Sequence, residues 1–277
     1  MTFALSTNWN NRRLAAGEAI ADEAQALGFD ALELGFRTTP EQVRGFKARL
    51  DAMPVSSVHA FCPVPLSAPR GYPELYLLAD FDEAARALAR VHVRKNIAFA
   101  AEMGADAVVL HAGRVPCSTL FRRNRLKKRT RLGHRLVDVF RGELDLLTPE
   151  LEKNGVRLGL ENLPYLEGFP NEDEIRELAG EWVRPWLDTG HAYVRQTNGW
   201  VSAEHAFCPC VPPLGLHLND SRGGDDHLPP GEGQIDFAAL ASVAHAARHL
   251  VLEPHADVAP EALKRGLDYL KNLWRTA

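Results

Sequence analysis

Short apolar runs alternate with longer amphipathic segments along the whole chain. Most of the apolar runs are continuous rather than alternating, which is typical of parallel strands that are covered on both faces. Helical periodicity fills the intervals, as in AAGEAIADEAQALG and APEALKRGLDYLKNLW, and several helices end in a glycine before the next strand (LGFDA, MGADA, NGVRL). Strands are predicted at 2–6, 31–36, 55–61, 107–113, 156–163, 183–188, 214–220 and 250–254.

Eight strand–helix repeats in 277 residues match the size of a (β/α)8 barrel. A doubly wound open sheet is the main alternative, but no glycine-rich phosphate-binding fingerprint follows the first strand. We therefore predict an α/β protein that folds as one (β/α)8 TIM barrel, a single domain over residues 1–277.

Metal-capable side chains stand near the C-terminal ends of six consecutive predicted strands. Barrel enzymes build their sites at this face, and several carboxylates cannot be buried together without a cation. A divalent metal site is therefore predicted. Glu161, Asp188, His217 and Glu253 combine three carboxylates with one imidazole, a set that suits Mn²⁺, Zn²⁺, Mg²⁺ or Co²⁺. The six strand-end residues are His59, His111, Glu161, Asp188, His217 and Glu253.

Further polar residues are predicted to reach the same cavity. His191 follows Asp188 by three residues in DTGH, and Asp225 and His227 lie on the loop after the seventh strand. Together with His59 and His111 they are candidates for additional metal ligands or substrate contacts, so one ion is expected and up to three can be held. Three smaller predictions concern Trp9 and Phe36, which either pack on a sugar ring or belong to the core, and Asn162, which would orient the adjacent Glu161.

Composition narrows the class of protein. The chain is 45% hydrophobic and 25% charged, as in ordinary globular proteins, and no apolar run approaches the ~20 residues of a membrane span. The N-terminus lacks the basic-then-apolar order of a signal peptide. The four cysteines, Cys62, Cys117, Cys208 and Cys210, suggest no disulfide framework. A cytoplasmic protein without a membrane partner is expected.

The formal net charge of −4 hides one strongly basic block. Between Arg114 and Arg141 the chain has eight Arg, two Lys and one Asp, a local excess of nine positive charges. Such a block either binds phosphates or nucleic acid, or forms the solvated face of a helix.

The motifs HAFCP, VVLHAG, LGLEN, LDTGHA, LHLND, DDHLPPGEGQIDF and LVLEP occur in this order. They resemble the xylose-isomerase-like TIM-barrel superfamily, which joins sugar (phosphate) isomerases and epimerases with zinc-dependent abasic-site endonucleases. The resemblance runs from about His59 to Glu253. It is specific for the superfamily and much less specific for the reaction.

Resemblance to the epimerase branch implies one divalent ion held by Glu161, Asp188, His217 and Glu253. It also implies that Glu161 and Glu253 act as acid and base on the carbon beside a carbonyl. His191 and Arg222 would hold substrate oxygens. The expected partner is a small sugar or sugar phosphate.

Resemblance to the endonuclease branch implies three zinc ions and a DNA substrate. Its nine ligand positions would be His59, His111, Glu161, Asp188, His191, His217, Asp225, His227 and Glu253. Two departures oppose it: the first strand, FALSTNWNN, lacks the opening motif of those nucleases, and AFCPVPL replaces a polar and aromatic stretch. A metal-dependent isomerase or epimerase is therefore the preferred prediction. A multinuclear phosphodiesterase is the alternative, and another metal-dependent lyase or a binding protein stays open.

Overall fold

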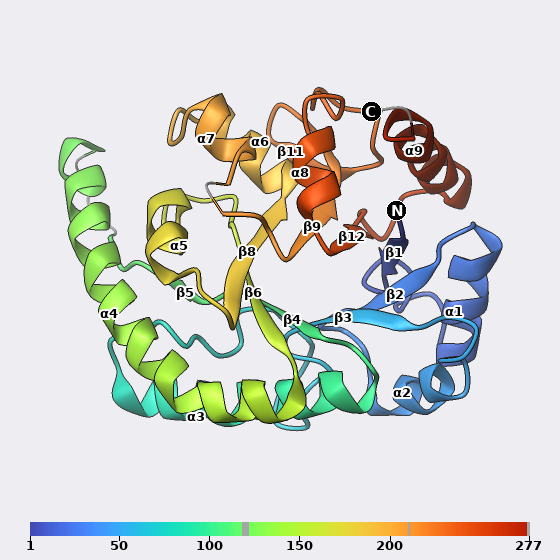
Figure 1. The fold of residues 1–277 in the computed structure, drawn as a ribbon, viewed down its shortest axis with the longest axis horizontal. Coiled ribbons are helices and arrows are strands. Elements are labelled where there is room, and N and C mark those ends of the chain that lie inside the picture. Colours follow the sequence, from blue (N-terminus) through green and yellow to red (C-terminus); the bar gives the residue numbers. More distant parts are fainter. Residues whose placement is uncertain (118–121, 210, 276–277) are drawn as a thin grey trace.

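Eight parallel strands close a barrel in the computed structural model, which describes residues 1–117, 122–209 and 211–275, without the side chains of 122 and 123 (Figure 1). The strands follow one another around the barrel in chain order, so the predicted (β/α)8 fold and all eight predicted strands are confirmed. The barrel strands are β1 (Phe3–Ser6), β2 (Ala31–Leu34), β3 (Val55–His59), β4 (Ala107–Leu110), β6 (Arg157–Glu161), β8 (Val183–Asp188), β9 (Gly215–Leu218) and β12 (His249–Leu252).

Helices surround the barrel and connect its strands (Figure 1). They are α1 (Gly17–Ala26), α2 (Pro40–Lys47), α3 (Glu83–Glu102), α4 (Arg122–Asn154), α5 (Glu172–Leu178), α6 (Thr189–Thr197), α7 (Ala203–Phe207), α8 (Ala241–Ala246) and α9 (Pro260–Leu273). Two small sheets stand outside the barrel. β5 (Gly113–Arg114) pairs with β7 (Gly168–Phe169), and β10 (Asp220–Arg222) pairs with β11 (Asp225–Leu228).

The predicted glycine ends of the helices are confirmed by their backbone conformation. Gly28, Gly104 and Gly155 have φ values of 91°, 77° and 64°. These angles lie in the left-handed region that glycine adopts without a steric penalty. Each glycine therefore ends a helix and turns the chain into the following strand, which aligns the strand ends on one face of the barrel.

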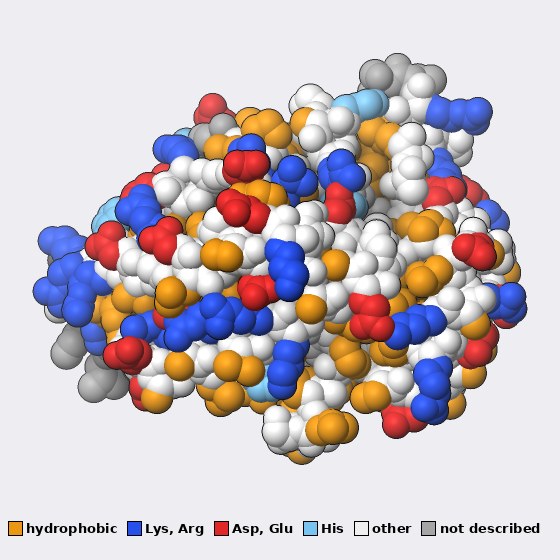
Figure 2. Space-filling view, turned by 60° about the horizontal axis from the view of Figure 1, so that its bottom comes forward, with side chains coloured by type: hydrophobic (Ala, Val, Ile, Leu, Met, Phe, Trp, Pro, Cys, Tyr) orange, Lys and Arg blue, Asp and Glu red, His pale blue; other side chains and the backbone are white. Residues whose placement is uncertain are grey.

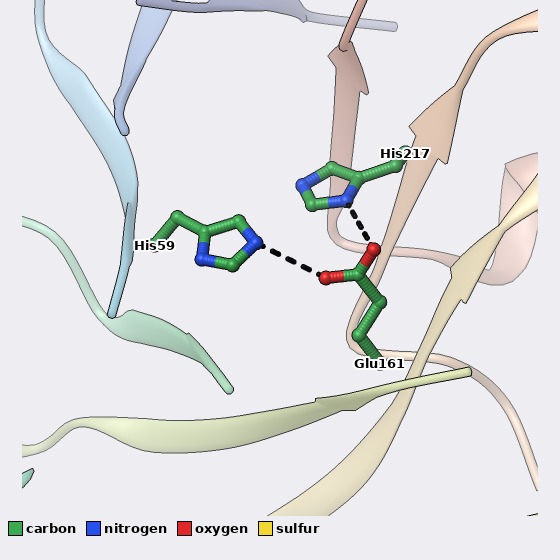
Figure 3. Close-up of side chains that lie close together, drawn as sticks. All are labelled: His59, Glu161 and His217. Atoms are coloured by element: carbon green, nitrogen blue, oxygen red, sulfur yellow. Dashed lines mark hydrogen bonds and ion pairs between the residues drawn. The ribbon is translucent and has the colours of Figure 1, made fainter. Parts of the chain in front are cut away.

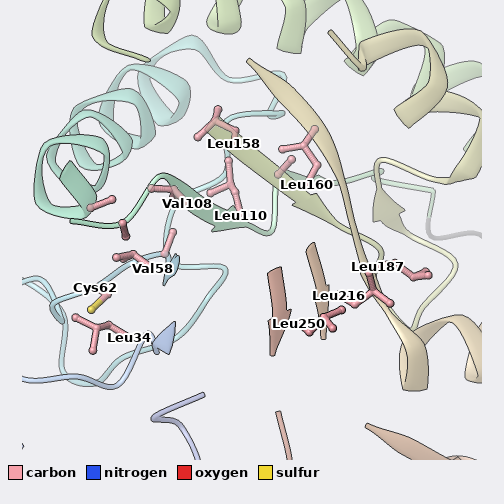
Figure 4. Close-up of a cluster of buried hydrophobic side chains, with 14 of the residues drawn as sticks. Leu34, Val58, Cys62, Val108, Leu110, Leu158, Leu160, Leu187, Leu216 and Leu250 are labelled. Carbon is pink, nitrogen blue, oxygen red and sulfur yellow. The ribbon is translucent and has the colours of Figure 1, made fainter. Parts of the chain in front are cut away.

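The main hydrophobic core lies between the strands and the surrounding helices. Figure 4 shows part of it, with Leu34, Val58, Leu110 and Leu160 among the labelled side chains. A second cluster of buried residues includes Trp186, whose side chain lies close to two strand glycines. A Cβ on Gly159 or Gly215 would stand only 2.6 or 2.5 Å from the Trp186 ring. The indole in turn meets the His217 ring edge-on at 5.3 Å, so it packs against that imidazole.

Most of the arginines of the basic block are neutralised by carboxylates or packed on rings. Arg114 pairs with Glu74, Arg125 with Glu167 and Arg141 with Glu177, while Arg135 lies over the Phe81 ring. On the face drawn in Figure 2, basic side chains gather at the left edge and acidic ones are interspersed over the rest. This pairing favours a structural role for much of the block over a free phosphate-binding surface.

Arg129 is the buried member of the block. Its guanidinium donates to the carbonyls of Leu166 and Gly168 and to the Glu174 carboxylate, and the Arg129 and Glu174 side chains are 4% and 3% exposed. It therefore holds the connection between β6 and α5 against α4.

Arg129→Met is expected to lower the free energy of unfolding by about 3–5 kcal/mol, because it leaves the Glu174 carboxylate buried without its partner. Chemical denaturation measures the change. Arg141→Gln, on the same helix but with a side chain that is 48% exposed, is the matched control and should cost about 0–1 kcal/mol. Equal, small effects in both variants would contradict a structural role for Arg129.

Two observations concern the predictions made about membrane spans and cysteines. Within the described ranges, no helix is long and apolar enough to cross a membrane. Cys62 and Cys117 are buried free thiols and Cys208 is an exposed one, whereas Cys210 lies outside the described residues.

Candidate metal centre

Four histidines surround one carboxylate at the C-terminal face of the barrel. Glu161, the last residue of β6, places Oε2 3.1 Å from His59 Nε2 and 3.0 Å from His111 Nε2. Its other oxygen, Oε1, lies 3.3 Å from Nδ1 of His191 and 3.3 Å from Nδ1 of His217. Figure 3 shows His59 and His217 approaching Glu161 from different strands. The strand ends thus converge on Glu161 as the sequence predicted.

His217 links the remaining members of the predicted four-residue site. Its Nδ1 lies 3.1 Å from Glu253 Oε2 and 3.9 Å from Asp188 Oδ2. One ligand atom from each of Glu161, Asp188, His217 and Glu253 lies within 4.8 Å of the others, and all four residues are buried. Two further groups satisfy the same criterion: His59 with Glu161 and His217, and Asp188 with His191 and His227.

Mutual attraction keeps the central groups charged despite their burial. Burial favours neutral Glu161, but His111 and His217 lower its pKa well below the usual range. Burial also opposes a charge on His111 and His191, yet Glu161 raises the pKa of His111 to about 9, and Asp188 with Glu161 raises that of His191 to about 10. Asp188 behaves differently, because burial raises its pKa. The negative charges that raise the pKa values of these histidines would also attract a bound cation.

Backbone carbonyls fix the orientation of three of the imidazoles. The Nδ1–H groups of His59, His191 and His227 donate to the carbonyl oxygens of Ala60, Asn162 and Glu253 at 3.1, 2.9 and 2.7 Å. Since a carbonyl can only accept, Nδ1 carries a proton in each ring, and Nε2 is the atom that could bind a ligand after it loses its proton.

Glu33 is a buried carboxylate of the site that is not among the residues predicted from the sequence. It lies within β2, is 0% exposed, and accepts from His217 Nε2 at 3.1 and 3.2 Å and from Ser57 Oγ at 2.8 Å. A glutamate inside the apolar strand ALEL was the available signal, because a buried carboxylate requires partners. By holding the Nε2–H of His217, Glu33 directs Nδ1 toward the three other carboxylates.

Asp188 is held by two asparagines and by the helix that it begins. Asn162 donates to the Asp188 carbonyl at 3.0 Å and accepts from its backbone N–H at 2.7 Å, and Asn219 Nδ2 donates to Oδ2 at 2.9 Å. The other oxygen, Oδ1, accepts from the His191 N–H at 2.7 Å as the N-cap of α6. In these hydrogen bonds Asn162 positions Asp188, and the prediction that it orients Glu161 is replaced by this role.

The residues present fit a divalent cation. Nδ1 of His217 is buried and makes no hydrogen bond within the described residues, although carboxylate oxygens surround it. Three carboxylates and one imidazole nitrogen are the donor set of Mn²⁺, Zn²⁺ and related ions. The cluster borders a cavity of about 660 Å³, which is also lined by Asn8, Phe36 and Arg37.

The family follows from a match to most of the chain. The family model described as "Xylose isomerase-like TIM barrel" matches residues 21–273. The chain belongs to this family. The resemblance seen in the strand-end motifs is thereby confirmed, and no curated protein matches the sequence.

Solved structures of the same fold include sugar epimerases. A D-tagatose 3-epimerase-like protein is 21% identical, with full coverage of both chains and a TM-score of 0.68. A D-psicose 3-epimerase, determined in the presence of D-fructose, is 15% identical over 99% of each chain with a TM-score of 0.69. A Thermus thermophilus protein soaked with ZnCl2 is 24% identical over 100% of this chain and 98% of the other, with a TM-score of 0.61.

Three of the residues predicted from the sequence do not line the cavity beside the cluster. Asp225 is exposed on β11, and the adjacent Asp226 instead approaches His191, with 3.9 Å between Oδ2 and Nε2. Arg222 is exposed and donates to the Glu232 carbonyl. Trp9 is buried in the core, where its Nε1–H donates to the Val258 carbonyl at 2.9 Å. The predictions of Asp225 as a metal ligand and of Arg222 and Trp9 as substrate contacts are corrected. Asp225 and Arg222 are exposed, and Trp9 belongs to the core.

Other residues near the cavity were also missed. Asn8 Nδ2 donates to Glu253 Oε1 at 3.0 Å, and Glu74 Oε1 lies 3.6 Å from His111 Nδ1. Neither residue belongs to one of the motifs, so their positions depend on tertiary structure. Phe36 does line the cavity, where its ring meets His59 edge-on at 5.1 Å.

Asp220 organises the loop that carries His227. Its carboxylate accepts from the backbone N–H groups of Ser221, Gly231, Gly233 and Ile235 at 2.8–3.0 Å. The Pro-Pro-Gly-Glu-Gly turn is therefore folded around one buried aspartate. The Asp220 carboxylate therefore stabilises the loop and is not one of the candidate metal ligands.

Proposed function

We propose that this family member is a divalent-metal-dependent sugar isomerase or epimerase that moves a proton beside a carbonyl. One ion, held by Glu161, Asp188, His217 and Glu253, would polarise the substrate carbonyl when bound. The observation that carries the proposal is the convergence of three buried carboxylates on His217 Nδ1 at a cavity open to a small molecule. The sugar epimerases of the same fold support it.

Glu161 and Glu253 are the proposed proton-transfer residues. β6 and β12 are separated by β8 and β9 in the barrel, so the two carboxylates approach the cavity from different directions. Glu253 is positioned by Asn8 Nδ2 at 3.0 Å and by Ser6 Oγ at 3.5 Å. A positioned, ionised carboxylate can remove a proton from carbon, and a second carboxyl group on another strand, once it carries a proton, can deliver that proton to the carbon.

A specific observation favours a second candidate, a multinuclear phosphodiesterase. The described residues hold two further ligand groups, His59–Glu161–His217 and Asp188–His191–His227. Two or three ions could share such a centre and act on a phosphate ester. The exposed position of Asp225 and the ion pairs of the basic block weigh against it.

The test incubates Mn²⁺-loaded and Zn²⁺-loaded protein with a panel of ketoses in deuterated water, and separately with an abasic-site duplex. We expect deuterium at the carbon beside the carbonyl, observed by NMR, and its loss when a chelator removes the ion. A melting temperature that rises with added metal is expected too, because the ion binds the folded state.

Nicking of the duplex without deuterium exchange on any ketose would replace the isomerase proposal with the phosphodiesterase. Full exchange in excess chelator, with metal content verified to be zero, would remove the ion from the reaction. Metal analysis of protein purified without added metal gives the number of ions per chain directly.

A further inference from the structure

A second, larger groove opens beside the metal-centre cavity. It encloses about 1270 Å³ and is lined by the segments that follow β1, β2 and β3. Arg37 lines both spaces, and Tyr72 of the groove adjoins Pro73 of the cavity in the chain. Arg37 therefore stands where the cavity and the groove adjoin.

Three arginines from three different connections face this groove. Arg12 follows β1, Arg37 follows β2 and Arg70 follows β3, while Glu41 is the acidic side chain of the lining. Within the described parts of the chain, no ion pair joins any of the three guanidinium groups to a carboxylate. This differs from the block on α4, where Arg125, Arg129 and Arg141 have acidic partners.

The three positive charges affect one another. Partial burial lowers the pKa of Arg37, and the nearby charges of Arg12 and Arg70 lower it further, against an opposing influence of Glu253. Arg37 is also placed by its own neighbour, since its guanidinium lies over the Phe36 ring at 5.1 Å. Like charges that are not held in ion pairs are stabilised when an anion binds, and guanidinium groups suit phosphate and carboxylate oxygens.

We propose that Arg12, Arg37 and Arg70 form a binding site for an anionic group of the substrate, so that the ketose carries a phosphate or a carboxylate at the end remote from the metal centre. This inference rests on the proposed function and names its substrate class. The sugar carbons would lie in the cavity beside Glu161 and Glu253. The anion would lie in the groove beyond Arg37.

The experiment compares three ketoses that differ at one carbon: D-fructose, D-fructose 6-phosphate and D-fructuronate. Calorimetry measures binding to the metal-loaded protein, and NMR measures deuterium exchange. We expect at least one anionic ketose to bind about tenfold or more tightly than D-fructose, with a preference that weakens at high salt. Tighter binding of D-fructose 6-phosphate would indicate a phosphate site, and tighter binding of D-fructuronate a carboxylate site.

Arg12→Gln and Arg70→Gln change exposed residues and should each lower the affinity ratio of the preferred anionic ketose to D-fructose by about tenfold. Arg44→Gln is the matched control. It removes one positive charge from exposed α2 surface outside the groove and should leave the ratio unchanged.

Equal affinity for all three ketoses, or a preference that survives in both variants, would overturn the anion site. If D-fructose still exchanged deuterium in that case, the proposed isomerase function would stand without it. If no ketose exchanged deuterium while the arginine-dependent preference persisted, the proposed function would fail and the anion site would stand. Binding of an abasic-site duplex through these arginines, without binding of either anionic ketose, would overturn the sugar assignment.

Discussion

Glu253→Gln is expected to abolish deuterium exchange on ketoses while leaving the barrel folded. Burial raises the pKa of Glu253, but the charges of His217 and His227 outweigh it and bring the value to about 2. The wild-type side chain is therefore an ionised base at neutral pH, and an amide cannot accept the proton from carbon. Loss of a positioned acid or base lowers a rate by about 10²–10⁴-fold.

The substitution preserves the shape of the side chain. A glutamine oxygen can still accept from Asn8 Nδ2, as Glu253 Oε1 does at 3.0 Å. Exchange is measured by NMR at saturating metal, because Glu253 is also a proposed ligand, and circular dichroism verifies folding. Glu232→Gln, at an exposed carboxylate beside Arg265, is the control and should retain wild-type exchange. Wild-type exchange in metal-loaded Glu253→Gln would exclude Glu253 from proton transfer.

The barrel and the four-residue cluster could be predicted because both follow from local sequence patterns. Continuous apolar runs such as AVVL at 107–110 give parallel strands, and the glycines after α1, α3 and α4 set where the next strand begins. A polar residue at the end of such a strand must lie at the C-terminal face. The sequence therefore predicts that Glu161, Asp188 and His217 lie together, and the structure brings them into one cluster.

The remaining site residues depend on geometry that no short motif contains. In the Asp225-Asp226-His227 stretch, the β10–β11 pairing and the φ of 56° at His227 determine which side chains turn inward, and Asp225 is exposed as a result. Trp9 follows β1 directly, but the chain curls back so that its indole meets the Val258 carbonyl. Conversely, Glu33 lies within a strand, where only barrel closure brings it to His217.

Removal of Glu33 is expected to weaken metal binding more than any other change outside the four proposed ligands. Its two oxygens lie 3.1 and 3.2 Å from His217 Nε2, so the carboxylate keeps the proton on Nε2 and presents Nδ1 to Glu161 and Glu253. Without it, the ring can rotate or change tautomer. Loss of such a partner lowers metal affinity by about 10–100-fold.

The experiment titrates Mn²⁺ and Zn²⁺ into wild-type protein, Glu33→Ala and Glu33→Gln by calorimetry. Glu33→Gln retains an oxygen that can accept from Nε2–H, so its dissociation constants should lie between those of the other two proteins. Nitrogen NMR of His217 in the Zn²⁺-loaded protein reports the tautomer independently of activity, and we expect the Nε2-protonated form in the wild type to become mixed in Glu33→Ala. Ser57→Ala, which removes only the 2.8 Å hydrogen bond to Glu33 Oε2, should affect binding less than either. Unchanged metal affinity and an unchanged tautomer in folded Glu33→Ala would show that Trp186 and the strand backbone are sufficient to orient His217.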